Sequence, residues 1–387
     1  MGKRVILIVA DSLGIGDAPD AVVYGDEGSN TLGAIRKSGF FNCPNLASLG
    51  LFNIDGVGGG AEKPKAGFAG LTERSAGKDT ITGHWEIAGL ITDRPFPVYP
   101  NGFPESVIAE FEKETGKKAI CNKPYSGTEV IKDYGEKQRQ SGDLIVYTSA
   151  DSVFQIAAHT DSVTEEELYG YCLKARKILS GEHAVARVIA RPFCGEYPFV
   201  RTSGRRDFSL PPTGKTMLDL IKGTGKEVVS IGKINDIFSG RGVTRAVHTD
   251  GNESGMKETL RAMDECASGL IFVNLVDFDM KYGHRNDVDG YAKAMTEFDS
   301  ELSFVIEKMK DEDLLVITAD HGCDPSTPST DHSRERVPAL FYGKSVRSGV
   351  NMGTRSSFAD ISATLLDYLD IDKDKTSGES MAKDLFM

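Results

Sequence analysis

The stretch "VILIVAD" (residues 5–11) decides the fold, because five consecutive β-branched or aliphatic residues run directly into an acid. A continuous apolar run of this length is typical of a strand covered on both faces, as in a parallel sheet. The same pattern recurs three times, with each run ending in acidic residues: "DLIVYTSAD" (143–151), "GLIFVNLVDFD" (269–279) and "DLLVITADHG" (313–322). The sequence therefore predicts several buried strands that each end in an acid.

Amphipathic stretches lie between these runs, for example residues 291–309, with apolar residues spaced three and four apart. Alternating strands and helices predict an α/β fold with a doubly wound core. In such sheets ligands bind beyond the carboxyl ends of the strands, so we expect the acids from distant segments to converge there. The alternative for each acid is a helix N-cap, a common role for Asp after a strand.

The middle of the chain predicts a second domain. At 387 residues the chain exceeds what one core usually holds. Segments rich in proline and glycine, at 94–104 and 209–216, have the composition of linkers. We expect a core of residues 1–96 and 214–387 and an inserted, smaller α+β cap domain of residues 97–213. Its expected strands include "DLIVYTS" and "ARVIARPF", with helices near 105–116 and 164–180.

Composition excludes several classes of protein. The net charge of −12 argues against a nucleic-acid surface, which needs a basic face. No apolar run approaches the roughly 20 residues of a membrane span. The six cysteines are scattered without a CxxC pair, which favours reduced thiols. The residues after Met1 do not form a secretory signal, so we expect a cytoplasmic location.

Three of the seven histidines lie in short acidic segments of the last third of the chain, "DFDMKYGH", "TADHGCD" and "STDHSRE". These three segments, together with the acid after the first strand, supply six candidate ligands for two divalent ions: Asp11, Asp279, His284, Asp320, His321 and His332. Mixed oxygen and nitrogen donors suit manganese or zinc better than calcium. A lone loop histidine is more often a surface residue, but six ligand-type residues at strand ends favour a metal site. We interpret Asp277, Asp324 and Asp331 as structural.

Two ions at strand ends can activate a hydroxyl and clamp a phosphoryl group. The segment "GKDTITG" (77–83) is a candidate source of the nucleophile, because its glycines permit a tight backbone that presents a side chain. The alternative is a polar loop whose threonines bond their own backbone. Composition alone leaves Ser12, Ser75, Thr80 and Thr82 open.

Six segments in family order resemble the prokaryotic phosphopentomutases of the alkaline phosphatase superfamily: "ADSLGIGDAPDA" (10–21), "GKDTITGHWEIAG" (77–89), "YTSADSVFQIAAH" (147–159), "VDFDMKYGHR" (276–285), "TADHGCDP" (319–325) and "TDHSRE" (330–335). The resemblance implies an alkaline-phosphatase-like core and a cap over the sugar. It also implies two ions, usually manganese, and assigns the phosphorylated residue to Thr80. One ion would take Asp11, Asp320 and His321, and the other Asp279, His284 and His332.

The implied reaction interconverts ribose or deoxyribose 1-phosphate and 5-phosphate, through a phosphothreonine and a sugar bisphosphate that also acts as activator. The basic residues of the middle segment would hold the phosphate that does not react. Arg187 and Arg191 fall on one face of a strand because side chains alternate. The resemblance favours Arg187, Arg201 and Lys233 as phosphate contacts, and Ser149 and Asp151 as sugar contacts.

Competing interpretations are weaker. "ADSLGIG" invites comparison with Gly-Asp-Ser-Leu esterases, but no histidine has the Asp three residues before it that this class uses. "TGKT" (213–216) lacks the first glycine of a phosphate-binding loop. A metal-dependent phosphomonoesterase or phosphoglycerate mutase of the same superfamily remains the alternative. The sequence leaves the oligomeric state open, and a monomer is compatible with it.

Overall fold

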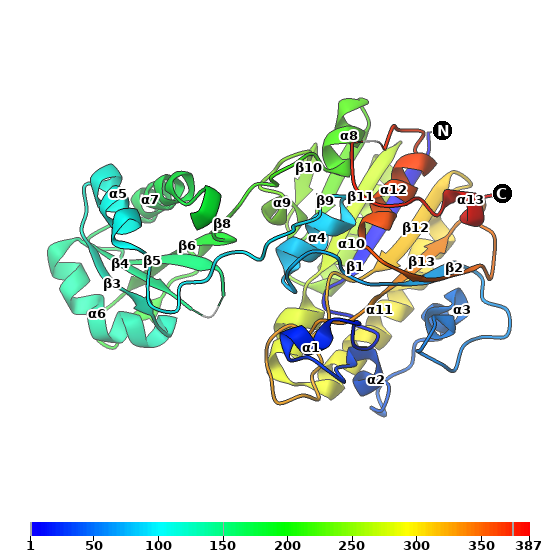
Figure 1. Ribbon diagram of the computed structural model, residues 1–387, viewed down its shortest axis with the longest axis horizontal. Coiled ribbons are helices and arrows are strands. Elements are labelled where there is room, and N and C mark those ends of the chain that lie inside the picture. The colour runs from blue at the N-terminus through cyan, green and yellow to red at the C-terminus, as the bar shows by residue number, and fades with distance from the viewer. Residues whose placement is uncertain (1, 150, 374) are drawn as a thin grey trace. The chain divides into compact units, whose positions relative to one another are not determined.

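The computed structural model describes residues 2–149, 151–373 and 375–387. The chain forms two compact units, one made of the residues up to Arg94 together with Pro212–Met387 and one of Pro95–Pro211. Figure 1 shows the smaller unit as a continuous insertion, in cyan and green, into the chain of the larger one.

The larger unit is built on one sheet. Its eight strands, counted in the described residues, lie in the order β10-β9-β11-β1-β12-β13-β2-β14. Their bounds are β1 (Arg4–Ala10), β2 (Gly67–Leu71), β9 (Glu227–Ile231), β10 (Arg245–Val247), β11 (Gly269–Leu275), β12 (Asp313–Thr318), β13 (Val337–Tyr342) and β14 (Asn351–Arg355).

The three strands with acidic ends are adjacent and parallel. β1 pairs with β11 on one side and with β12 on the other, and Val9 lies opposite both Asn274 and Thr318. Every residue of β1 is buried, as its continuous apolar run predicts. Parallel neighbours in register bring their carboxyl ends to the same edge, so the segments after β1, β11 and β12 meet there.

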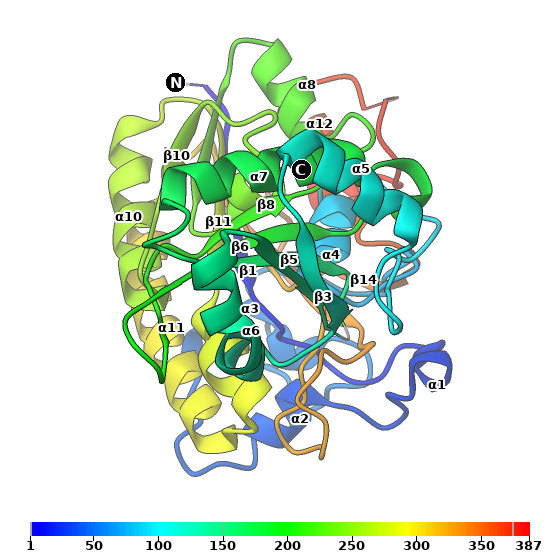
Figure 2. The same cartoon turned by 90° about the vertical axis from the view of Figure 1, so that its left-hand side faces the viewer.

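Helices cover both faces of this sheet, which confirms the doubly wound α/β prediction. Figure 2 shows α10 and α11 on one side of the strands and α4 and α12 on the other. The α-helices of this unit are α1 (Ala21–Tyr24), α2 (Thr31–Ile35), α3 (Pro44–Leu49), α4 (Thr80–Ile87), α8 (Met217–Gly223), α9 (Ile234–Ile237), α10 (Asn252–Glu265), α11 (Val288–Lys308), α12 (Ala359–Tyr368) and α13 (Ala382–Leu385). Shorter turns are η1 (Leu51–Asn53), the π-helical η3 (Phe278–Tyr282) and η4 (Gly283–Arg285).

The smaller unit has its own mixed sheet, in the order β3-β4-β5-β6-β7 with β8 also paired to β6. The strands are β3 (Ala119–Pro124), β4 (Leu144–Thr148), β5 (Val153–His159), β6 (Arg187–Cys194), β7 (Val200–Arg201) and β8 (Arg206–Ser209). The helices are α5 (Glu105–Thr115), α6 (Gly127–Ser141) and α7 (Glu165–Ile178), with the turn η2 (Gly181–His183). Side chains of α5, α7, β4, β5 and β6 share an apolar core.

One of the four acid-ended strands therefore belongs to the smaller unit. Asp151 follows β4, which pairs with β3 and β5 and not with the strands of the larger sheet. The expected convergence of acids holds for the other three strands. Within the described residues no helix is long and apolar enough to cross a membrane. All six cysteines are free thiols, four of them buried.

Candidate metal centre

The carboxyl edge of the central strands carries three buried acids. Asp11 follows β1 directly, Asp320 lies two residues after β12, and Asp279 lies on the π-helical turn after β11. Asp11 and Asp320 are completely buried and Asp279 is 4% exposed. Isolated buried carboxylates are costly, so this clustering calls for a positively charged partner.

Histidine nitrogens lie among these carboxylates. His321 Nε2 is 3.3 Å from Asp320 Oδ2 and 3.5 Å from Asp11 Oδ1. His284 Nε2 is 3.1 Å from Asp279 Oδ2. His332 Nε2 is 3.5 Å from Asp279 Oδ1 and 3.2 Å from His284 Nε2. The fold thus brings together all six residues that the sequence nominated as ligands.

The donor atoms fall into overlapping groups whose members lie within 4.8 Å of one another: Asp11, Asp320 and His321; Asp279, His321 and His332; and Asp279, His284 and Cys323. The first group is the expected set for one ion. The second group places His321 near Asp279 as well as near Asp11 and Asp320. The third group brings a third type of donor, the Cys323 thiol, next to Asp279 and His284.

The polar atoms of the site fit divalent cations. Among the described residues Asp11 Oδ1, Asp279 Oδ1 and Asp320 Oδ2 are buried, and apart from the nearby histidine rings no hydrogen-bond partner satisfies them. The Nδ1 atoms of His284 and His332 lie 2.7 Å and 3.0 Å from backbone carbonyl oxygens. An Nδ1–H that donates to a carbonyl leaves the Nε2 lone pair free for a metal. Orphaned carboxylate oxygens and free imidazole nitrogens at this spacing are the donors that manganese and zinc accept.

The electrostatics of the site show the same need for cations. Burial, together with the nearby charges of Asp320 and Asp279, raises the pKa of Asp11 to about 8. Burial alone would lower the pKa of His332, but the adjacent Asp279 carboxylate raises this pKa to about 9. Burial and the neighbouring His332 lower the pKa of His321 to about 4. Protons on Asp11 and His332 thus partly offset the negative charge of the clustered carboxylates, as bound cations would.

Thr80 is the hydroxyl that faces these groups. It is the first residue of α4, whose N-cap Asp79 accepts hydrogen bonds from the N–H groups of Ile81 and Thr82 at 3.0 Å and 3.2 Å. This cap fixes the start of the helix. Thr80 Oγ1 lies 3.3 Å from His321 Nε2, beside the first group of ligands.

The three other candidate hydroxyls point elsewhere. Ser12 is buried with a φ of 70° and its Oγ lies 3.1 Å from the hydroxyl of Tyr291. Thr82 Oγ1 donates to Asp79 at 2.9 Å, and Ser75 Oγ accepts from the backbone N–H of Thr92 at 3.1 Å. The structure thus separates Thr80 from the alternatives that composition left open.

Gly83 allows α4 to approach the metal centre. A Cβ atom at this position would collide with the backbone carbonyl of Asp320, so only glycine permits this contact. The turn of helix that carries Thr80 is therefore held directly against the strand end that carries Asp320 and His321.

Sequence reasoning missed the residues that hold the ligands in place. Asn274 Nδ2 donates to Asp11 Oδ2 at 2.9 Å, and His84 Nδ1 lies 3.1 Å from Asp320 Oδ2. The sequence contained one signal for each of these two residues. Asn274 is the single polar residue within the apolar strand "GLIFVNL", and His84 lies one helical turn after Thr80. Tyr291, at the start of α11, also donates to the backbone carbonyl of Asp11 at 3.3 Å.

The predicted substrate contacts lie in both units. Ser149, Asp151, Arg187 and Arg201 belong to the smaller unit, where Arg187 Nη2 is 3.8 Å from Asp151 and Ser149 Oγ accepts from the Asp151 N–H at 3.3 Å. Arg201 lies exposed on β7. Lys233 precedes α9 in the larger unit, near enough to Asp11 to lower the pKa of that carboxyl. Their roles stay predictions.

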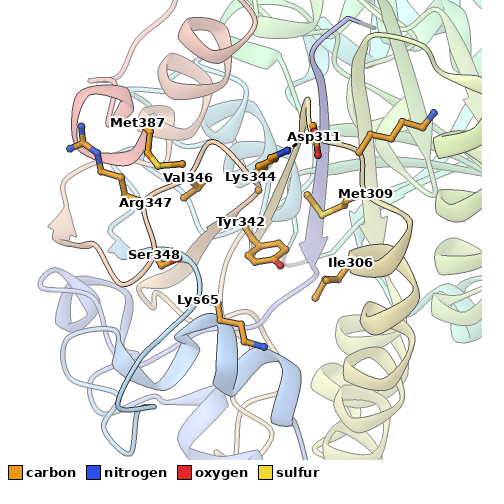
Figure 3. A pocket seen from close by; sticks show the side chains of 12 residues that line it. Lys65, Ile306, Met309, Asp311, Tyr342, Lys344, Val346, Arg347, Ser348 and Met387 are labelled. Carbon is orange, nitrogen blue, oxygen red and sulfur yellow. Dashed lines mark hydrogen bonds and ion pairs between the residues drawn. The ribbon is translucent and has the colours of Figure 1, made fainter.

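A surface depression of about 560 Å³ lies away from these residues (Figure 3). It is lined by Met309 and Asp311 ahead of β12 and by Tyr342 and Lys344 at the end of the antiparallel β13. These positions mark the amino-terminal edge of β12, opposite to the edge that carries Asp320. The depression contains none of the candidate ligands.

The fold and the cluster of donors define a metalloenzyme, and a family model described as the Metalloenzyme superfamily matches residues 3–373. Among solved structures, the PH0037 protein from Pyrococcus horikoshii shares the fold, with a TM-score of 0.50 at 14% identity over 96% of this chain and 98% of that one.

Two relatives specify the family. The phosphopentomutase of Lachnoclostridium phytofermentans is 57% identical over 99% of both chains. That of Acetivibrio thermocellus is 57% identical over 98% of both. The chain belongs to the phosphopentomutases. The comparisons support this activity and not the alternatives of a phosphomonoesterase or a phosphoglycerate mutase.

Proposed function

We propose that this phosphopentomutase moves a phosphoryl group between Thr80 and the sugar, and so interconverts ribose or deoxyribose 1-phosphate and the corresponding 5-phosphate. The observation that carries the proposal is the position of Thr80 Oγ1, 3.3 Å from His321 Nε2 at the edge of the metal centre. A hydroxyl held beside metal ligands is placed to become a phosphoryl carrier.

The proposed cycle balances without an outside reactant. The phosphorylated Thr80 gives its phosphoryl group to the free hydroxyl of a sugar monophosphate, so one P–O bond breaks at Oγ1 and one forms on the sugar. The sugar proton returns to Thr80. The resulting bisphosphate turns around and transfers its other phosphoryl group to Thr80, which regenerates the phosphoenzyme. A sugar bisphosphate is therefore also the expected activator.

We assign the ligands of two ions as the family resemblance implies; the first set coincides with one donor group, and the second set is supported by the short distances among its three side chains. Asp11, Asp320 and His321 would hold one ion, and Asp279, His284 and His332 the other, with manganese as the proposed metal. Two bound divalent ions supply charge neutralisation for the phosphoryl oxygens and for the Thr80 oxygen as it is released. The N-cap at Asp79 keeps Thr80 in place, and His84 and Asn274 keep Asp320 and Asp11 in place.

We propose that the smaller unit acts as a cap that binds the sugar phosphate. Arg187 and Arg201 would hold the phosphate that does not react, because a guanidinium matches phosphate oxygens in pairs. Lys233 would assist from the larger unit, and Ser149 and Asp151 would contact the sugar hydroxyls. We also propose that the enzyme works in the cytoplasm, because a reducing compartment keeps its six free thiols reduced.

The test is the intact mass of the protein after incubation with manganese and ribose 1,5-bisphosphate. We expect one added phosphate that maps to residues 78–82 after digestion and that chelator prevents. Thr80→Ala should gain no phosphate, whereas the matched Thr82→Ala should still gain it, since Thr82 Oγ1 bonds to Asp79 and not to the histidines. A wild-type enzyme that isomerises without any adduct would overturn the phosphothreonine mechanism.

A further inference from the structure

The segment between β2 and α4, residues 72–79, leads directly into Thr80 and forms neither helix nor strand. Backbone groups that are buried in such a segment need partners from outside it, because no helix or ladder supplies them. Glu86 of α4 is completely buried and accepts hydrogen bonds from the N–H groups of Arg74, at 2.8 Å, and of Ser75. A buried acid thus holds two donors of this segment, and its carbonyl oxygens call for a buried donor.

The guanidinium of Arg334 is that donor. Arg334 is only 2% exposed. Its Nη1 donates to the carbonyl oxygens of Ser75, at 2.9 Å, and of Gly77, and its Nη2 donates to the carbonyl oxygen of Glu73 at 2.7 Å. Three carbonyl groups within residues 73–77 therefore bond to one side chain.

Two carboxylates fix the orientation of this guanidinium. Glu73 Oε2 accepts from Nη1 at 2.7 Å, and the carboxylate of Asp20 accepts from Nε at 3.1 Å and from Nη2 at 2.9 Å. A guanidinium presents five N–H donors in a rigid plane, whereas an ammonium is a single point of charge. Only arginine can therefore reach both carboxylates and the three carbonyl groups at once.

The backbone of Arg334 belongs to the segment that carries two candidate ligands. His332 lies two residues before it, and Ser333 pairs with Gly322 in an antiparallel bridge with N–H to oxygen distances of 3.1 Å and 2.8 Å. Gly322 directly follows His321. The Arg334 side chain thus extends from the metal centre to the segment that precedes Thr80.

The same two segments meet again closer to Thr80. His332 Nδ1 lies 3.0 Å from the carbonyl oxygen of Lys78, two residues before Thr80. The Lys78 ammonium lies 3.0 Å from Asp26, which also accepts from the backbone N–H of Arg334 at 2.8 Å. The path from residue 73 to residue 78 is therefore held against the metal centre at both of its ends.

We infer that Arg334 is a positioning residue for the phosphoryl transfer: its guanidinium holds residues 73–77 against the segment of His332, and so sets the position of Thr80 relative to the candidate ligands. The inference rests on the proposed function of Thr80 as the phosphoryl carrier. Arg334 acts through the backbone of residues 73–77 and not on the reacting atoms. A displacement of about 1 Å at reacting atoms can lower the rate about 100-fold.

The test is the steady-state kinetics of Arg334→Lys in the manganese-loaded full-length enzyme. Lysine keeps the positive charge beside Glu73 and Asp20 but lacks the planar set of donors for the three carbonyl groups. We expect kcat to fall on the order of 100-fold, with the KM for ribose 1-phosphate nearly unchanged and both manganese ions retained. The rate at which ribose 1,5-bisphosphate phosphorylates Thr80, followed by intact mass, should fall with kcat.

Arg4→Lys is the matched control. Arg4 is also 2% exposed, and its guanidinium bonds to the carboxylate of Asp313, at 3.0 Å and 2.6 Å, and to the carbonyl oxygens of Met263 and Cys266. It lies at the start of β1, at the opposite edge of the sheet from the metal centre. Arg4→Lys should lower the melting temperature as much as Arg334→Lys does, and leave kcat unchanged.

Asp20→Asn tests the same inference at an exposed position. The Asp20 side chain is 43% exposed, so its replacement is compatible with folding. It removes one of the two charges that orient the Arg334 guanidinium, and we expect kcat to fall about 10-fold with KM nearly unchanged.

The outcomes separate this inference from the proposed function. Wild-type kcat in both Arg334→Lys and Asp20→Asn, or an equal loss of kcat in Arg4→Lys, would overturn the positioning role and leave the phosphothreonine cycle standing. A fall to one bound ion in Arg334→Lys would also overturn it, because Arg334 would then act through His332.

A loss of kcat confined to Arg334→Lys and Asp20→Asn, with two ions bound, supports the positioning role. The same selective loss in an enzyme whose wild type never phosphorylates Thr80 would keep the positioning role for residues 73–77 and reject the phosphothreonine cycle.

Discussion

The metal centre and the arginines of the smaller unit differ in how firmly the fold holds their side chains. The ligands of the metal centre follow three parallel strands in register, and Asp11 and Asp320 are completely buried. Among these arginines, Arg187 lies on β6 and Arg201 on the short strand β7, and the side chains of Arg187 and Arg205 are 36% and 46% exposed. Groups that break bonds need fixed positions, whereas groups that capture a substrate need access to it.

The largest effect is expected at Thr80, the proposed nucleophile. Thr80→Ala should lower isomerase activity by on the order of 10⁴-fold or more, because the other candidate hydroxyls, of Ser12, Ser75 and Thr82, bond to groups other than the candidate ligands. Thr80→Ser, which keeps an oxygen, should retain measurable turnover. Activity assays with both variants, together with manganese binding and melting temperature, check this. Substantial activity in Thr80→Ala would mean that the position of Thr80 beside the metal centre does not identify it as the residue that carries the phosphoryl group.

The second largest effect is expected from a substitution at the candidate metal ligand Asp320. Asp320→Asn removes a carboxylate that lies close to both His84 and His321, and should weaken manganese binding at one of the two sites more than about 100-fold, since even outer partners of ligands are worth 10–100-fold. Metal content after gel filtration should fall from two ions to one. The exposed neighbour variant Asp331→Asn should keep two. Two tightly bound ions in Asp320→Asn would show that this acid is structural.

The arginines of the smaller unit should give a smaller effect of a different kind. Arg187→Ala should raise the KM for ribose 1-phosphate about 10-fold, as expected for one partly exposed phosphate contact, with manganese affinity unchanged. Arg139, which pairs with Glu196 on the surface of the same unit, offers the matched control Arg139→Ala. A fall in kcat without a change in KM would place Arg187 in the chemical step and remove the contrast between the two regions.

The smallest effect concerns pH and metal removal. The folded pKa values of Asp11, about 8, and His332, about 9, are raised above the ordinary 3.8 and 6.5. A raised folded pKa means that the folded state binds more protons, so the free energy of unfolding in chelator should fall as pH rises from 6.5 to 8. His321 shifts the other way, but between about 4 and 6.5, outside this window.

Thermal melts in chelator and in excess manganese measure this dependence. We expect the melting temperature to drop by several degrees between pH 6.5 and 8 in chelator, and to drop less with manganese, which replaces the protons. A chelator-treated protein whose melting temperature rises through this window would contradict the interpretation that protons compensate the acids of the metal centre.

The sequence predicts the metal centre better than its surroundings, for a physical reason. Acids at the ends of apolar runs converge because parallel strands end at one edge, and this rule needs only the pattern of residues around Asp11, Asp279 and Asp320. The roles of His84 and Asn274 depend on how α4 and β11 pack, which no spacing rule supplies.

The contact at Gly83 limits how this protein can change. With no room for even one methyl group between α4 and the carbonyl of Asp320, the helix cannot tilt or slide toward that strand end. Thr80, the proposed nucleophile, and the candidate ligand Asp320 therefore keep a fixed relative position. Adaptation toward larger substrates would have to come from segments outside this contact, because the methyl group of Gly83→Ala would push Thr80 away from Asp320 and His321.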